Sequence, residues 1–295
     1  MSIVSLDKER ILNTIDLQDK MEHLEKNNLF SWDDCKSILD KYSERKSILK
    51  KVSEDLLLEL NGIEDVHSIR IRIKDPVSLI QKIIVKKFEN NEKYGSLTPG
   101  NYDFLVTDLI GARLILRFKH EWESVHKWLR IIFDVNRGED DYAPPSAENV
   151  DFYKDKNESF RCFVEIPVAY YRSGDDDSIY SKENDNSIKP VQSKSHSNYR
   201  SIHYVIRYKN VFIEIQVRTI FEEAWGECNH ELVYKQPEGT RKIMQKRSSD
   251  ILSAIAHQGD EISSFMYLVS QGDLLNLPEG CEGLDCSRIK IAEKG

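Results

Sequence analysis

Residues 200–218 read RSIHYVIRYKNVFIEIQVR, and this stretch decides the fold. Apolar residues recur at every second position in 200–208 and again in 211–217, and only Lys209 and Asn210 separate the two runs. Such alternation is typical of strands that bury one face, and a two-residue connection between them predicts a β-hairpin.

The second strand of this hairpin carries polar side chains on one face. Because successive side chains of a strand point to opposite sides, the apolar residues at 211, 213, 215 and 217 share the core face. The opposite face carries Phe212, Glu214, Gln216 and Arg218. From this pattern alone two interpretations stay open, an edge strand with a solvated polar face or a functional site.

Working outward, helical periodicity alternates with short apolar runs. N-terminal capping signals stand at Ser31, with Asp34 three residues later, and at Asp75-Pro76. The expected elements are helices at 7–60, 77–88, 120–133, 219–235 and 240–269 and strands at 112–118 and 160–168. Helices around a small sheet in mixed order define an α+β (mixed α/β) class. We expect a helical extension over 1–65, a central domain over 66–238, and a C-terminal helical extension and tail over 239–295.

Composition excludes several classes of protein. The chain has 295 residues, of which 40% are hydrophobic and 31% charged, as is typical of a soluble globular protein. Its net charge of −8 argues against a generally basic nucleic-acid binder. No apolar run reaches the roughly 20 residues that span a bilayer, and the N-terminus lacks a signal-peptide pattern. The five cysteines lack zinc-ligand spacing, so we expect reduced thiols, a cytoplasmic location and no membrane partner.

A basic cluster surrounds the helix start at Pro76. Ser78 and Lys82 share one helical face, and Arg72 and Lys74 share one side of the extended segment before it. Cations and a hydroxyl at a helix N-terminus predict a polyphosphate cradle, and the alternative is a solvated basic helix end.

Two further groups have the chemistry of a site. Asp108 precedes an apolar strand, with Gly111 and Arg113 after it, and such a carboxylate either holds Mg²⁺ or caps a turn. Tyr199 lies in the loop before the hairpin, where an aromatic ring either stacks on a base or packs at the rim of the sheet. His203 is a second candidate, or a structural histidine.

The order of these groups resembles the synthetase domain of RelA/SpoT proteins. The motifs R-x-K-x-x-x-S-x-x-x-K, D-x-x-G-x-R, Y-R-S-x-H, E-I-Q-x-R-T and W-x-E-x-x-H-x-x-x-Y-K follow one another between residues 72 and 235. They comprise Arg72, Lys74, Ser78 and Lys82; Asp108, Gly111 and Arg113; Tyr199, Arg200, Ser201 and His203; Glu214, Gln216, Arg218 and Thr219; and Trp225, Glu227, His230, Tyr234 and Lys235. The chain is similar in size to small alarmone synthetases and their toxin relatives.

The resemblance implies a nucleotidyltransferase-like mixed sheet flanked by helices. It also implies transfer of the β,γ-pyrophosphate of ATP to the 3′-hydroxyl of GTP or GDP, which yields (p)ppGpp and AMP. By this resemblance, Arg72, Lys74, Ser78, Lys82 and Arg113 bind ATP; Asp108 and Glu214 hold Mg²⁺; Glu214, Asp108 and Arg218 are catalytic; and Tyr199, His203, Gln216 and Lys194 bind the acceptor. ATP and a guanine nucleotide are the expected partners, while tRNA, an antitoxin and a homo-oligomer are left open.

Three departures from the family pattern fall on the acceptor side. Asn198 replaces a glycine that many members have before the tyrosine. Ser195 holds the place of a frequent lysine, with Lys194 one residue earlier, and Asn229 replaces a glutamate that small synthetases often carry. Two alternatives therefore stay open. One is a toxin-type enzyme whose acceptor is the 3′-CCA end of tRNA or an adenine nucleotide. In the tRNA case, the basic run at 235–247 would contact the RNA backbone. The other is a non-catalytic nucleotide sensor.

Overall fold

The computed structural model describes residues 8–89, 92–135, 144–146, 152–153, 156–172, 175, 188–193, 199–234 and 240–270. These residues form two compact units. The first contains the described residues up to Leu116 together with those of Glu121–Ile220, and the second contains Arg117–His120 and the described residues from Phe221 onward.

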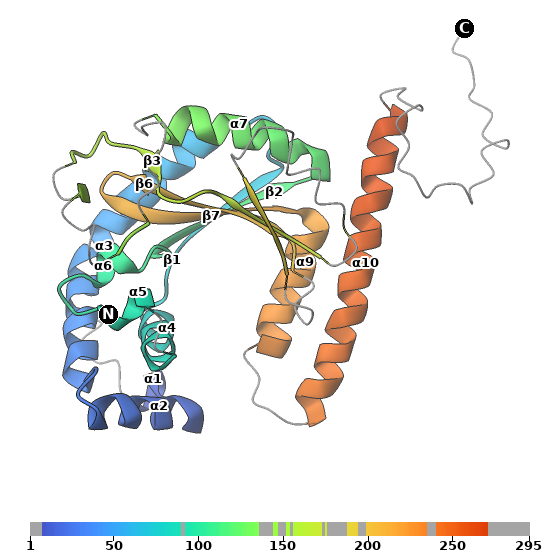
Figure 1. Ribbon diagram of the computed structural model, residues 1–295. Coiled ribbons are helices and arrows are strands. Elements are labelled where there is room, and N and C mark those ends of the chain that lie inside the picture. Colours follow the sequence, from blue (N-terminus) through green and yellow to red (C-terminus); the bar gives the residue numbers. More distant parts are fainter. Residues whose placement is uncertain are drawn as a thin grey trace, which may run out of the picture. The chain divides into compact units, whose positions relative to one another are not determined.

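The first unit is built on a mixed sheet, which confirms the expected fold class. Its strands are β1 (Ser68–Ile73), β2 (Ile110–Leu116), β3 (Cys162–Phe163), β4 (Val168–Tyr171), β5 (Lys189–Gln192), β6 (Ser201–Tyr208) and β7 (Val211–Thr219). The order is β1-β2-β7-β6-β4-β5, and β3 pairs with β6. The pairs β2·β7 and β4·β5 are parallel and the other pairs are antiparallel (Figure 1).

The predicted hairpin lies in the middle of this sheet, as β6 and β7. Lys209 and Asn210 connect the strands with φ angles of 47° and 61°. Two consecutive left-handed residues give a tight turn whose twist matches that of the flanking strands. The hairpin prediction is therefore confirmed, including its turn.

Helices of the first unit follow most of the expected ranges. They are α1 (Lys8–Ile11), α2 (Ile15–Lys26), α3 (Trp32–Leu60), α4 (Pro76–Phe88), α5 (Glu92–Gly95), α6 (Tyr102–Leu105) and α7 (Trp122–Phe133). The single helical region expected over 7–60 is three helices, and Asn28, with a φ of 54°, lies in the break before α3. Ser31 and Asp34 form the predicted capping box of α3, and Asp75 caps α4.

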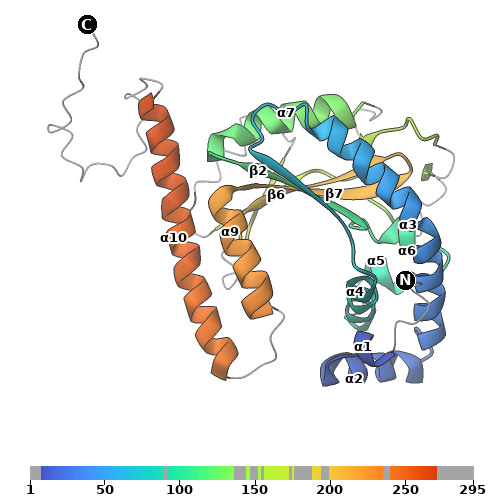
Figure 2. The same ribbon diagram turned by 180° about the vertical axis from the view of Figure 1, so that it is seen from behind.

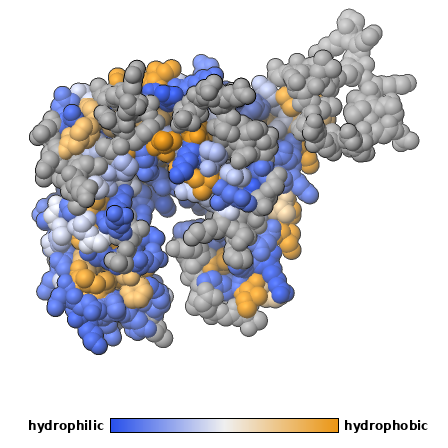
Figure 3. All heavy atoms as spheres, in the orientation of Figure 1, coloured by the Kyte–Doolittle hydropathy of each residue, from blue (hydrophilic) through white to orange (hydrophobic). Residues whose placement is uncertain are grey.

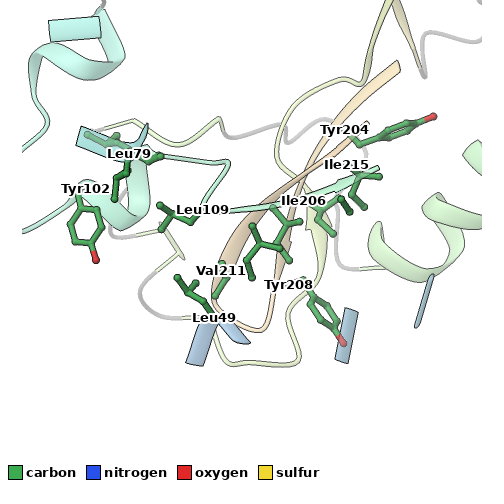
Figure 4. Close-up of a cluster of buried hydrophobic side chains, with 14 of the residues drawn as sticks. Leu49, Leu79, Tyr102, Leu109, Tyr204, Ile206, Tyr208, Val211 and Ile215 are labelled. Atoms are coloured by element: carbon green, nitrogen blue, oxygen red, sulfur yellow. The ribbon is translucent and has the colours of Figure 1, made fainter. Parts of the chain in front are cut away.

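The core lies between the apolar face of the sheet and the helices α3 and α7. Both helices lie on the same side of the sheet (Figures 1 and 2). Leu49 of α3 packs in the same buried cluster as Tyr204 and Ile206 of β6 and Ile215 of β7 (Figure 4). Because this cluster fills one face of the hairpin, the polar face of β7 points away from it.

The second unit contains α9 (Ile220–Asn229), which continues into a π-helical turn at His230–Tyr234, and the long helix α10 (Thr240–Ser270). Trp225 of α9 contacts α10 through hydrogen bonds: its Nε1 donates to the backbone carbonyl and to the hydroxyl of Ser249, each at 3.1 Å. Among the described helices, none is long and apolar enough to cross a membrane.

Candidate functional site

The strand register brings the predicted residues onto one face of the sheet. Arg72 on β1 lies opposite Gly111 on β2, and Gly111 lies opposite Glu214 on β7. Gln216 is flanked by Arg113 on β2 and His203 on β6. Directly opposed residues of neighbouring strands point to the same side of a sheet. Residues far apart in the sequence therefore share one polar surface.

A carboxylate between two lysines forms the first half of the site. Asp108 lies between α6 and β2, and its Oδ2 accepts from the Nζ of Lys74 at 2.7 Å and pairs with the Nζ of Lys82 at 2.9 Å. The Asp108 side chain is 12% exposed and that of Lys74 is 10% exposed. Two cations on one carboxylate leave this cluster with a net positive charge, which favours an anionic ligand.

Opposing effects set the pKa values of this cluster. Burial alone would raise the pKa of Asp108, but the charges and hydrogen bonds of Lys82 and Lys74 hold it down at about 2. Burial lowers the pKa of Lys74, while Asp108 raises that of Lys82 against the effect of burial. The carboxylate is therefore ionised throughout the physiological pH range.

The N-terminus of α4 is already occupied by a carboxylate of the chain. The side chain of Asp75 accepts from the backbone N–H of Ser78 at 2.9 Å, and Pro76 has no N–H to offer. Fewer backbone amides are therefore available to an anion here than the sequence suggests. The side chains of Arg72 and Ser78 are exposed, and their binding of phosphates together with Lys82 stays a prediction.

A closed ring of hydrogen bonds forms the second half of the site. The Nε2 of Gln216 donates to Glu214 Oε2 at 2.8 Å, and the Nη2 of Arg218 donates to Gln216 Oε1 and, at 2.7 Å, to the hydroxyl of Tyr199. That hydroxyl lies 2.7 Å from His203 Nε2, and His203 Nδ1 lies 3.3 Å from Glu214 Oε1. Both oxygens of Glu214 are thus held by the ring.

His203 connects the Tyr199 hydroxyl to Glu214. Its Nε2 lies 2.7 Å from that hydroxyl and its Nδ1 lies 3.3 Å from Glu214 Oε1. The tautomer of the ring decides which atom of the Tyr199–His203 pair donates. Burial raises the pKa of Glu214, but the hydrogen bond and charge of His203 outweigh it, and the net pKa is lowered.

Tyr199 is packed as well as hydrogen-bonded. Its ring lies 5.1 Å from the Arg218 guanidinium, and its centroid is 5.8 Å from that of Tyr170 and 5.7 Å from that of His203. Burial raises the pKa of its hydroxyl, so the phenol stays protonated. Stacking of Tyr199 on an acceptor base stays a prediction, and the structure adds a role for its hydroxyl.

Sequence analysis missed four residues of this surface. Glu165, between β3 and β4, interacts electrostatically with Lys93 of α5, with His203 and with Glu214. Its pKa is raised by burial and by the charge of Glu214. Tyr94 contacts Lys82, and Tyr170 of β4 lies edge-on to His203 with the ring centroids 5.0 Å apart. The sequence does contain one indication of Glu165, because it is the single acidic residue in the apolar run at 160–168.

Other residues of the motifs have structural contacts. Arg200 pairs with both carboxylate oxygens of Asp175, and the hydroxyl of Ser201 donates to the carbonyl of Val217 at 3.2 Å. Asn229, in the second unit, accepts from the hydroxyl of Ser249 at 2.9 Å. Lys194, expected to bind the acceptor, lies outside the described residues.

Asp108 and Glu214 are the residues whose chemistry suits a divalent metal ion. Within the described part of the chain, no group of three or more His, Cys, Asp or Glu side chains is arranged around a metal position. However, the Oδ1 of Asp108 is buried, and the residues that the structure describes offer it no hydrogen-bond partner. Mg²⁺ is commonly bound by one or two carboxylates with phosphate oxygens and water completing its shell, so the two residues fit such an ion.

The comparisons with known proteins identify the family. The model of the region found in RelA / SpoT proteins matches residues 71–239, more than half of the chain. The chain therefore belongs to the RelA/SpoT family.

Solved structures of low identity also match, while no curated protein matches the chain. Small alarmone synthetase 1 from Bacillus subtilis, bound to its product pppGpp, is 21% identical, with 74% of this chain and 94% of that chain covered and a TM-score of 0.43. A second structure of the same synthetase is 19% identical, with 79% and 99% covered and a TM-score of 0.48. A GTP pyrophosphokinase family protein from Streptococcus pneumoniae is 18% identical, with 88% and 96% covered and a TM-score of 0.39.

Proposed function

We propose that the protein is an ATP-dependent pyrophosphokinase that transfers the β,γ-pyrophosphate of ATP to the 3′-hydroxyl of GTP or GDP. One observation carries the proposal: a cation-rich carboxylate cluster at Asp108 shares a polar surface with a second carboxylate, Glu214, whose two oxygens are both held by neighbouring side chains. Membership of the RelA/SpoT family supports the same reaction.

The donor binds, in this proposal, at the start of α4. Arg72, Lys74, Ser78 and Lys82 contact the phosphates, and Arg113 assists from β2. Lys74 and Lys82 are already ordered by Asp108, so little side-chain entropy is lost when phosphate oxygens arrive. Phosphoryl-type transfer depends on positioning and charge neutralisation more than on covalent catalysis, and a set of ordered cations supplies both.

Asp108 and Glu214 would hold Mg²⁺ together with the donor phosphates. The ion, when bound, neutralises charge on the transferring group. The Oδ1 of Asp108 supports this assignment, because it is buried and has no hydrogen-bond partner among the described residues. Burying a carboxylate oxygen without a partner costs free energy, and a bound metal ion would offset that cost.

Glu214 orients the acceptor. In the transfer, the 3′-oxygen forms a bond to the β-phosphorus, the bond from that phosphorus to the α,β-bridging oxygen breaks, and AMP leaves. The proton of the 3′-hydroxyl passes to Glu214 or, through it, to solvent. The lowered pKa of Glu214 keeps it ionised and able to accept a hydrogen bond from the hydroxyl.

Incubation with γ-labelled ATP and a panel of GTP, GDP, GMP, ATP and bulk tRNA tests the proposal. We expect label to appear on GTP or GDP, with stoichiometric release of AMP. Label on tRNA or on an adenine nucleotide instead would identify a toxin-type acceptor and refute the guanine assignment. Binding of ATP with no labelled product from any acceptor would identify a nucleotide sensor and refute the enzyme assignment.

A further inference from the structure

Lys74 joins β1 to α4, and its backbone is held by hydrogen bonds from two sides. Its backbone N–H donates to the carbonyl of Leu109 at 2.9 Å. Its own carbonyl accepts from the hydroxyl of Tyr42, a residue of α3, at 2.5 Å. Leu109 directly follows Asp108, which pairs with the side chain of Lys74. The lysine and the carboxylate are therefore joined through their backbones as well as through their side chains.

Tyr42 makes this contact from the interior of the first unit. In the space-filling view, the part of that unit that contains α2 and the beginning of α3 presents a mainly hydrophilic surface (Figure 3). Tyr42 is in contrast only 1% exposed. Burial raises the pKa of its phenol, and the nearby charges of Asp75 and Asp108 add to the rise. The hydroxyl therefore stays protonated and donates to Lys74 throughout the physiological pH range.

Neighbours of this tyrosine on α3 hold the segment that leads into Asp108. The Nζ of Lys41 donates to the carbonyl of Pro99 at 2.9 Å. Arg45, one helical turn further along α3, pairs with Asp103 of α6. One short stretch of α3 thus contacts both segments of the chain that carry the ion-paired cluster, and it contributes no side chain to the cluster itself.

We propose that Tyr42 is a positioning residue of the donor site, whose hydroxyl fixes the backbone of Lys74 and thereby directs its ammonium group at Asp108 and at the phosphates of ATP. This role rests on the proposed function, because it takes the ATP phosphates as the ligand of Lys74. A lysine side chain is a flexible stem, so its charged end is directed accurately only when its backbone is fixed. Without the hydroxyl, the carbonyl of Lys74 loses its partner and the junction between β1 and α4 is free to shift.

Equilibrium binding of an ATP analogue tests the role of Tyr42 without turnover. The analogue carries a methylene group between the α- and β-phosphorus atoms, and this bridge cannot be cleaved in the transfer. Tyr42→Phe should bind it roughly 3- to 10-fold more weakly than the wild type, as expected for the loss of one hydrogen bond that orders a phosphate-binding group. An unchanged affinity would overturn the proposal.

Two matched controls separate positioning from a loss of stability. Tyr204→Phe removes a buried hydroxyl that lies 3.1 Å from Nδ1 of His126, so it should lower the melting temperature and leave the affinity for the analogue unchanged. Tyr102→Phe removes a buried hydroxyl that has no hydrogen-bond partner among the described residues, so it should change neither quantity. If Tyr204→Phe weakened binding as much as Tyr42→Phe, affinity would follow stability alone and the positioning role would be wrong.

Combination with Lys74→Ala shows whether Tyr42 acts through Lys74. In that background Tyr42→Phe should have little further effect on the affinity for the analogue, because the side chain that it positions is absent. Losses that simply add would refute the proposal. The outcomes are also distinguishable from those of the labelling experiment. Weaker binding by Tyr42→Phe with no labelled acceptor would uphold the positioning role and refute only the transfer, whereas unchanged binding with a labelled guanine nucleotide would refute only the positioning role.

Discussion

The hydroxyl of Tyr199 is the most specific test of the hydrogen-bonded ring. Tyr199→Phe keeps the aromatic ring and its contacts with Arg218, Tyr170 and His203 but removes one oxygen. His203 Nε2 then loses its hydrogen-bond partner and Arg218 Nη2 loses one acceptor. We expect His203 to turn or change tautomer, so that it no longer holds Glu214.

The magnitude follows from the two partners that are left unsatisfied. An unsatisfied buried polar group costs about 1–3 kcal/mol, which corresponds to a loss of roughly 5- to 150-fold in kcat if the whole cost falls on the transition state. Because the aromatic face remains, the KM for the acceptor should change little. Tyr199→Ala should lower kcat to a similar extent and also raise the acceptor KM, since a stacked base is worth roughly 1–3 kcal/mol.

The assay is initial-rate kinetics with ATP and the acceptor varied in turn. Tyr170→Phe is the matched control, because it removes a hydroxyl from the same aromatic cluster and, within the described residues, that hydroxyl makes no hydrogen bond. The control should retain wild-type kcat. If Tyr199→Phe also retained it while Tyr199→Ala did not, stacking alone would explain the residue and the positioning role of the ring would be wrong.

Three further predictions concern the two carboxylates and the lysines. Glu214→Gln should reduce turnover by about two orders of magnitude or more while the fold is retained, because the charge is lost on a polar face that does not touch the core; near-normal kcat would remove Glu214 from the mechanism. Lys74→Ala and Lys82→Ala should each raise the KM for ATP about 10- to 100-fold, as expected for hydrogen bonds to a charged group; a selective rise in the acceptor KM would contradict the donor assignment. Asp108→Asn should lower the free energy of unfolding by about 2 kcal/mol at neutral pH. The pKa of Asp108 in the folded state is depressed to about 2, so this difference in stability should be present above about pH 4 and vanish as the pH falls through 2. Urea denaturation at several pH values would measure it. A difference that is independent of pH would refute the ion-pair origin.

Some elements of the fold were predictable because their signals are local. The period-two alternation and the Lys209-Asn210 turn identified the hairpin, and the capping residues Ser31 and Asp75 identified two helix starts. Each signal acts over a few residues of chain. The same locality explains one error: the break between α1 and α2 was missed, because the helical periodicity continues on both sides of it.

The identities of the site residues could be listed from the sequence, but their partners could not. The period-two alternation of the strand placed Glu214, Gln216 and Arg218 on one face. It did not distinguish a solvated face from a functional site. The register of β6 against β7 decides this, because it sets His203 beside Gln216 and lets the loop residue Tyr199 close the ring.

By itself, the sequence determined the family, the order of the motifs and the local elements that carry them, since periodicity, capping and turn chemistry act between near neighbours in the chain. Tertiary structure alone decided that Asp108 lies between Lys74 and Lys82 and that Glu165 and Lys93 join the polar surface. These contacts join residues that are tens of positions apart, and strand register and helix packing, which act across the whole chain, bring them together.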